Sequence, residues 1–63
     1  MVRNELYDLI REHPGSTTRE LRDMTDHSMG AIHKGLVDLM NQGMIAGVKN
    51  GTRFEWRVIK GLG

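Results

Sequence analysis

The spacing of apolar residues changes once along this chain, at Met44. Before that point apolar residues recur at the 3.6-residue spacing of amphipathic helices, and after it they alternate at the two-residue spacing of a half-buried strand. The alternating segment contains Asn50-Gly51, the strongest short signal for a two-residue hairpin turn. The sequence therefore predicts a small α+β domain, with helices first and a two-stranded antiparallel β-hairpin after them.

The first two predicted helices are separated by a turn at Pro14 and Gly15. Proline ends the first helix, because the residue before it is pushed out of the helical conformation. The second helix begins with a capping box, in which Thr17 is the N-cap residue and Glu20 reaches back to its backbone. The residues of these two helices expected to face inward are Val2, Leu6, Leu9, Ile10, His13, Leu21 and Met24.

The third predicted helix begins at Ser28, a favourable N-cap residue, and Gly43 follows its end as a left-handed residue. Apolar residues at helical spacing are expected to face the core: Ile32, Leu36, Leu39 and Met40. The sequence thus predicts three helices within residues 2–42.

The hairpin register is predicted from the Asn50-Gly51 turn, which pairs Lys49 with Thr52 and Ile45 with Trp56. One face of the hairpin is then expected to lie against the helices, with Ile45, Phe54, Trp56 and Val58 on it, and the opposite face carries Val48, Arg53, Glu55 and Arg57. The three aromatic residues, Tyr7, Phe54 and Trp56, are expected in the core. Residues 1–60 are expected to form one domain, with residues 61–63 as a flexible tail.

Size and composition argue against an enzyme. A chain of 63 residues buries too little surface for a deep catalytic pocket, and the absence of cysteine excludes disulfides and thiolate zinc sites. Asp23 and His27, at i, i+4 spacing, are one possible helical pair of ligands, but two side chains do not make a metal site. We therefore expect a non-enzyme without a cofactor or metal. No signal peptide or apolar run of about 20 residues is present, so a cytoplasmic protein that does not contact membranes is expected, associated with the nucleoid in a bacterium or phage.

Charge is unevenly distributed along the chain. Residues 1–27 hold four arginines and six carboxylates, a net charge of −2, whereas residues 28–63 hold five cations and two carboxylates, a net charge of +3. An acidic front half and a basic back half indicate one electropositive face, which favours a polyanionic partner.

The order helix, helix, helix, strand, Asn-Gly turn, strand resembles the winged helix-turn-helix family over about residues 2–59. The segment Ser28-x3-Ile32-x3-Leu36-x2-Leu39-x3-Gly43-Met44-Ile45 is similar to the recognition helix of that family running into the first wing strand. Residues 12–17, followed by Glu20-Leu21, resemble the passage from its first to its second helix. The resemblance implies binding to double-stranded DNA and a role in transcription regulation. The recognition helix, about 28–42, would lie in the major groove, and the β-hairpin wing, about 44–59, on the minor groove or backbone.

Three groups of residues are expected to contact DNA. The outward side of the third helix near its N-terminus would read the major groove, and the resemblance implies that His33 and Lys34 make most of the base contacts. The wing tip would supply contacts to the minor groove or phosphates, and the start of the second helix a phosphate contact. The full set of expected DNA-binding residues is Thr17, Thr18, Arg19, Ser28, Met29, Gly30, His33, Lys34, Lys49, Asn50, Thr52 and Arg53.

A protein-interaction winged helix is the alternative function. Met29, Val37 and Val48 are apolar residues expected on the presumed reading face, and they suit a protein groove better than phosphates. A chain this small would bind DNA weakly alone, so a homodimer or a larger parent protein is also considered.

Overall fold

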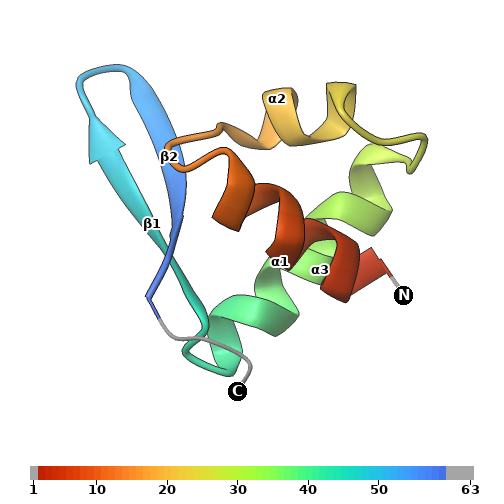
Figure 1. Cartoon of the computed structure of the whole chain (residues 1–63). Coiled ribbons are helices and arrows are strands. Elements are labelled where there is room, and N and C mark those ends of the chain that lie inside the picture. The colour runs from red at the N-terminus through yellow and green to blue at the C-terminus, as the bar shows by residue number, and fades with distance from the viewer. Residues whose placement is uncertain (1, 60–63) are drawn as a thin grey trace.

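The computed structural model describes residues 2–59, and it has the predicted order of elements (Figure 1). Three helices, α1 (Val2–Glu12), α2 (Thr18–Asp23) and α3 (Met29–Asn41), are followed by two strands, β1 (Ile45–Asn50) and β2 (Arg53–Val58). The strands form an antiparallel hairpin beside the helices. The small α+β architecture predicted from the sequence is confirmed. The expected tail, residues 61–63, lies outside the described residues.

The predicted helix boundaries are confirmed at each capping residue. The Thr17 hydroxyl accepts a hydrogen bond from the Glu20 N–H at 3.1 Å, and the Glu20 carboxylate accepts one from the Thr17 N–H at 2.9 Å. The Ser28 hydroxyl accepts from the Ala31 N–H at 3.2 Å. Gly43, with φ of +71°, follows the last turn of α3 in the left-handed conformation. These local bonds explain why the helices begin and end as the sequence indicates.

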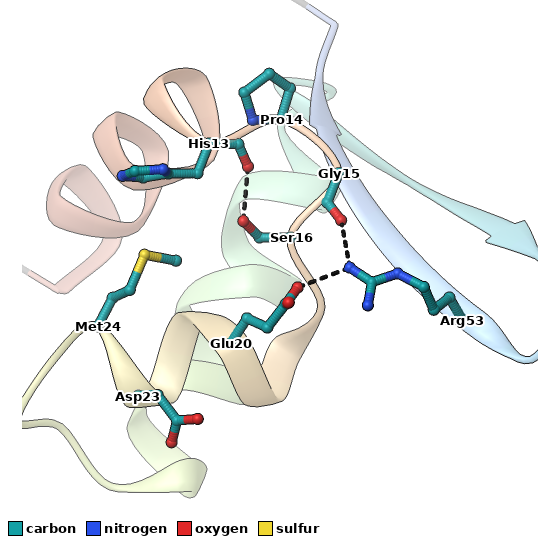
Figure 2. A pocket seen from close by; sticks show the side chains of 8 residues that line it. All are labelled: His13, Pro14, Gly15, Ser16, Glu20, Asp23, Met24 and Arg53. Atoms are coloured by element: carbon teal, nitrogen blue, oxygen red, sulfur yellow. Dashed lines mark hydrogen bonds and ion pairs between the residues drawn. The ribbon is translucent and has the colours of Figure 1, made fainter.

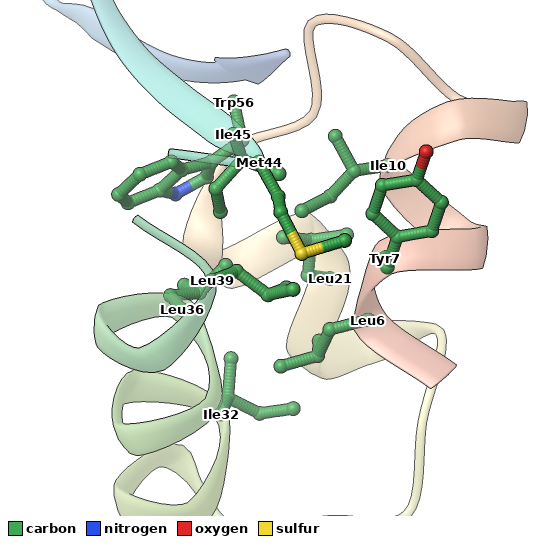
Figure 3. Close-up of a cluster of buried hydrophobic side chains, with 10 residues drawn as sticks. All are labelled: Leu6, Tyr7, Ile10, Leu21, Ile32, Leu36, Leu39, Met44, Ile45 and Trp56. Carbon is green, nitrogen blue, oxygen red and sulfur yellow. The ribbon is translucent and has the colours of Figure 1, made fainter. Parts of the chain in front are cut away.

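The core lies between α1, α2, α3 and the base of the hairpin (Figure 3). Tyr7 and Trp56 are buried as expected. The buried hydrophobic residues are Leu6, Tyr7, Ile10, Leu21, Ile32, Leu36, Leu39, Met44, Ile45 and Trp56.

Three residues predicted to face inward are exposed instead. His13 follows the last residue of α1, and Met24 follows the last residue of α2, so neither continues the stripe of its helix. Met40 is 44% exposed, because it lies about 80° around α3 from Ile32, beyond the face that Ile32, Leu36 and Leu39 cover. The predicted inward positions of these three side chains were wrong.

The predicted hairpin register was also wrong, by two residues. Asn50 pairs with Arg53 and Ile45 with Val58, so the central turn residues are Gly51 and Thr52. A type I′ turn at Asn50-Gly51 would need positive φ at both residues, but only Gly51 has it, at +65°. A glycine with positive φ at the first central position, followed by a residue without it, is the pattern of a type II′ turn. A shift of two residues keeps every side chain on its predicted face of the hairpin.

Phe54 is on the predicted face but is 49% exposed, so its expected place in the core was wrong. The ring lies beyond the part of the hairpin that the helices cover. It packs over Gly47, where a Cβ atom would overlap it, and against Trp56 edge to face, with ring centroids 5.2 Å apart. The absence of a side chain at Gly47 therefore allows the Phe54 ring to pack against the hairpin itself.

Residues 15–16, in the turn before α2, pair with β2 on the side opposite β1. The Trp56 N–H donates to the Ser16 carbonyl at 2.8 Å, and the Gly15 N–H donates to the Trp56 carbonyl at 3.0 Å. The indole N–H of Trp56 donates to the Thr18 hydroxyl at 2.9 Å. β2 is thus fixed between β1 and the turn that precedes α2. Within residues 2–59, no helix combines the length and apolar character required to cross a bilayer.

Candidate nucleic-acid interface

The outward side of α3 near its N-terminus is open to solvent. Ser28, Met29, Gly30, His33 and Lys34 are all exposed, as a groove-reading helix requires. No atom of a neighbouring element lies within 4 Å of a Cβ built on Gly30, so the backbone there is accessible. This part of the expected site is brought together on one short helical surface.

Helical spacing extends that surface beyond the residues expected from the sequence. Gly30, Lys34, Val37 and Asn41 occur at i, i+4, i+7 and i+11, opposite the buried stripe of α3. Asn41 is exposed and adds an amide to the far end of this surface. Asn41 was not expected here, because it lies outside the N-terminal turns of the helix, although the same helical spacing leads to it.

The tip of the hairpin presents Lys49, Asn50 and Thr52 to solvent. Lys49 stands opposite Phe54 in the register, so the lysine and the half-exposed ring share one face of the wing. The wing tip therefore carries a cation and polar groups, as the expected site requires.

The side chains at the start of α2 are already used inside the protein. Thr17 is the N-cap, and the Thr18 hydroxyl accepts the indole N–H of Trp56. The Glu20 carboxylate itself supplies the negative charge that the N-terminus of a helix favours. Of the three residues expected here, Thr17 and Thr18 are half-buried and Arg19 is exposed.

The Arg53 side chain is half-exposed at the start of β2, but its guanidinium is bonded within the protein. Its guanidinium donates to the Glu20 carboxylate at 2.8 Å, to the Glu55 carboxylate at 3.1 Å and to the Gly15 carbonyl at 3.2 Å. Figure 2 shows the Arg53 and Glu20 side chains pointing toward one another. Both residues line an open hollow of about 470 Å³. Periodicity and motif spacing do not indicate this cluster, because Gly15 and Glu20 lie more than 30 residues from Arg53 in the sequence.

The same contacts shift two pKa values. The pKa of Glu20 lies below its ordinary value of 4.5, because the carboxylate accepts the Thr17 backbone N–H and then the Arg53 guanidinium. The pKa of Arg53 is raised by its bonds to Glu55 and Glu20, so the guanidinium stays charged.

Acid should weaken the domain partly through Glu20. A carboxyl whose pKa is lowered on folding stabilises the folded state above the unfolded value, about 4.5, and this contribution is lost as the pH falls through the lower folded value. We expect Glu20→Gln to be less stable than the wild type at about pH 6 and the difference to shrink toward about pH 3. Urea unfolding of both proteins across this range measures the difference. If the free energies of unfolding of the two proteins differed by the same amount at every pH, the stabilising role of the Glu20 carboxylate would be contradicted.

The cations of the described residues divide into two groups. Arg11, Arg22, Arg53 and Arg57 each lie within 4 Å of a carboxylate, whereas Arg3, Arg19, Lys34 and Lys49 have no ion-pair partner within residues 2–59. Of the second group, Arg19 is on α2, Lys34 on α3 and Lys49 on β1. The unpaired cations therefore include one on each of the three elements expected to contact DNA.

The histidines form no metal centre in the part of the chain that the structure describes, where no group of three metal-binding side chains occurs. His27 lies 3.1 Å from the Glu5 carboxylate, and Asp23 lies beside Arg22.

No protein-family model, curated protein or solved structure matches the chain.

Proposed function

We propose that this chain is a double-stranded DNA-binding module of the winged helix-turn-helix type. α3 would enter the major groove, and the hairpin formed by β1 and β2 would contact the adjacent minor groove or backbone. The observation that carries the proposal is a set of exposed cations on α2, α3 and β1, namely Arg19, Lys34 and Lys49, which have no ion-pair partner within residues 2–59. A cation without an internal partner can neutralise a phosphate without first breaking an ion pair.

The surface of α3 suits close approach to DNA. Gly30 places no side chain between the first turn of the helix and the sugar-phosphate backbone. One turn further along, Lys34 is positioned to donate to guanine O6 or N7, and His33 to a purine acceptor or a phosphate. The reading positions hold no arginine or glutamine, so phosphate contacts are expected to supply most of the affinity.

The proposed biological role is that of a small regulator of transcription. One module of this size covers only about 600–1,000 Å² on DNA, which is small for a tight specific complex. Two copies on neighbouring half-sites, or a parent protein containing this domain, would supply the remaining affinity.

Lys34→Ala should lower the affinity for duplex DNA and weaken its salt dependence. The logarithm of the binding constant falls with the logarithm of the salt concentration by about 0.9 for each neutralised phosphate, so losing one contact should reduce the slope by about one. Fluorescence anisotropy with a duplex of random sequence, between about 50 and 200 mM salt, measures this slope.

Arg11→Ala is the matched control, because it removes one positive charge from an exposed position on α1, where Arg11 is paired with Asp8 at 3.4 Å. Its slope should equal that of the wild type. Equal slopes for the wild type and Lys34→Ala would remove Lys34 from the interface, and equal reductions in both variants would show that only net charge matters.

Exposed apolar residues favour the alternative, a protein partner. Met29 on α3 is 40% exposed and Val48 on β1 is 43% exposed. Burial of such residues stabilises protein interfaces and contributes nothing to a phosphate contact. If the wild type binds no duplex at about 50 mM salt, the alternative becomes the better proposal, and Met29→Ser should then weaken binding to the partner.

A further inference from the structure

Arg53 connects β2 to residues 15–20, a stretch more than 30 residues away in the sequence. Its Nη2 atom donates to the Gly15 carbonyl, 38 residues away, and to Glu20, 33 residues away, while its Nε atom donates to Glu55 on the same strand. A planar guanidinium can serve several acceptors at fixed angles, which a lysine ammonium does less well. The arginine therefore fixes both the distance and the direction between β2 and the start of α2 (Figure 2).

The Glu20 oxygen that receives Arg53 is also part of the helix cap. Oε1 of Glu20 accepts the Thr17 N–H at 2.9 Å and the Arg53 guanidinium at 2.8 Å. The cap holds the carboxylate against the first turn of α2, so the acceptor for Arg53 is itself immobilised. The wing is thus tied to a rigid point of the helical layer, and α2 packs in turn against α3.

The bonds of Arg53 to Gly15 and Glu20 hold the hairpin near its turn, because of where Arg53 lies along β2. Arg53 is the first residue of β2 and pairs with Asn50, so only Gly51 and Thr52 lie beyond it at the tip. The other polar links between β2 and the α2 segment are made at Trp56, three residues closer to the base. Arg53 is therefore the outermost anchor of the hairpin, and Lys49, which pairs with Phe54, lies one pair closer to the base.

We infer that Arg53 is a positioning residue, which sets the angle of the wing relative to α2 and α3 rather than binding a phosphate itself. This inference rests on the proposed DNA-binding function, for which the spacing between Lys34 on α3 and Lys49 on the wing must match the spacing of DNA grooves. With Arg53 bound to two carboxylates and a carbonyl, the wing tip reaches DNA in one orientation. The phosphate contact expected at Arg53 from the sequence then belongs to Lys49.

The first test examines the free protein and needs no DNA. Residual dipolar couplings of backbone amides report the orientation of residues 49–54 relative to α2 and α3. In Arg53→Ala these couplings should no longer fit the wild-type orientation of the wing, while those of the helices should be unchanged. Arg57→Ala is the matched control, since Arg57 lies on the same face of β2 and contacts Glu55 at 3.6 Å, but within residues 2–59 it makes no hydrogen bond or ion pair with Glu20 or Gly15. Its couplings should fit the wild-type orientation.

Two further variants separate the contribution of charge from that of guanidinium geometry in the Arg53–Glu20 pair. Glu20→Gln keeps an oxygen that can accept the Thr17 N–H but removes the charge that pairs with Arg53, so the cap should survive while the wing reorients partly. Arg53→Lys retains the charge without the fork and should restore the orientation only in part. Wild-type couplings in Arg53→Ala would overturn the inference.

The second test measures DNA affinity and salt dependence together. Arg53→Ala should lower the affinity by about threefold to tenfold with an unchanged salt slope, because no phosphate contact is lost. Lys49→Ala should reduce the slope by about one. A slope reduced by about one in Arg53→Ala would overturn the inference and make Arg53 a phosphate ligand. If the wild type binds no duplex, the proposed function fails, and the couplings alone decide whether Arg53 positions the wing.

Discussion

Trp56→Ala should severely destabilise the domain. The indole is 7% exposed, and its removal would leave a cavity among residues from all three helices and β1. Truncation of a buried aromatic side chain costs about 3–5 kcal/mol. A domain of this length is expected to have a free energy of unfolding of about 3–9 kcal/mol, so the substitution removes a large share of it. Circular dichroism during urea and thermal unfolding measures the change.

Trp56→Phe is the matched variant, because it retains most of the ring volume and loses the hydrogen bond to Thr18. That bond should contribute about 1 kcal/mol, and Thr18→Val should lose a similar amount. If both substitutions destabilise the domain by removing this same bond, the double variant Trp56→Phe/Thr18→Val should be no less stable than the less stable of the two single variants. A loss in Trp56→Phe as large as that in Trp56→Ala would show that the bond, and not the packing, stabilises this region.

Leu36→Ala should have the second largest effect. Leu36 is 1% exposed on the face of α3 that meets the core, where Leu→Ala substitutions cost about 2–5 kcal/mol. The control on the same helix is Met40→Ala, since Met40 is 44% exposed and its truncation should cost no more than about 0.5 kcal/mol. Urea midpoints of the two variants give the comparison.

The Met40 result also tests the placement of α3 about its own axis. If Met40→Ala were as destabilising as Leu36→Ala, Met40 would belong to the core, as the apolar spacing alone suggested. The expected surface of α3 at Gly30 and Lys34 would then be rotated away from DNA.

Features that depend on a few neighbouring residues were predictable from the sequence. The capping box at Thr17 and Glu20, the N-cap at Ser28 and the left-handed Gly43 each satisfy backbone groups within one helical turn. The change of apolar spacing at Met44 likewise identified the hairpin. Local chemistry fixes these elements, and the predicted architecture followed from their order.

Features that depend on distant partners were not predictable in this way. The hairpin register follows the turn type, and the sequence Asn50-Gly51-Thr52 allows a turn at either of two adjacent positions. Alternation gave the correct face for Phe54, but the exposure of its ring depends on how far the helices extend over the hairpin. Pattern alone contains no information on that extent.

The candidate site shows the same division. Exposure of Lys34, Lys49 and Arg19 could be predicted from helical spacing and the turn signal. The pairing of Arg53 with Glu20 could not, because the two residues are 33 positions apart and meet only when β2 lies beside the segment before α2. Ion pairing separates the cations available to a ligand from those used inside the fold.

The central place of β2 also determines how this chain acquires its structure. Each helix can begin to form from bonds within its own turns, but Trp56 meets Thr18 only after a loop of 38 residues has closed. Long-range closure of this kind loses chain entropy before any contact compensates for it, so docking of the hairpin should limit the folding rate. Substitutions at the β2 contacts with residues 15–18 should therefore slow folding, whereas losses in the helix caps should mainly speed unfolding.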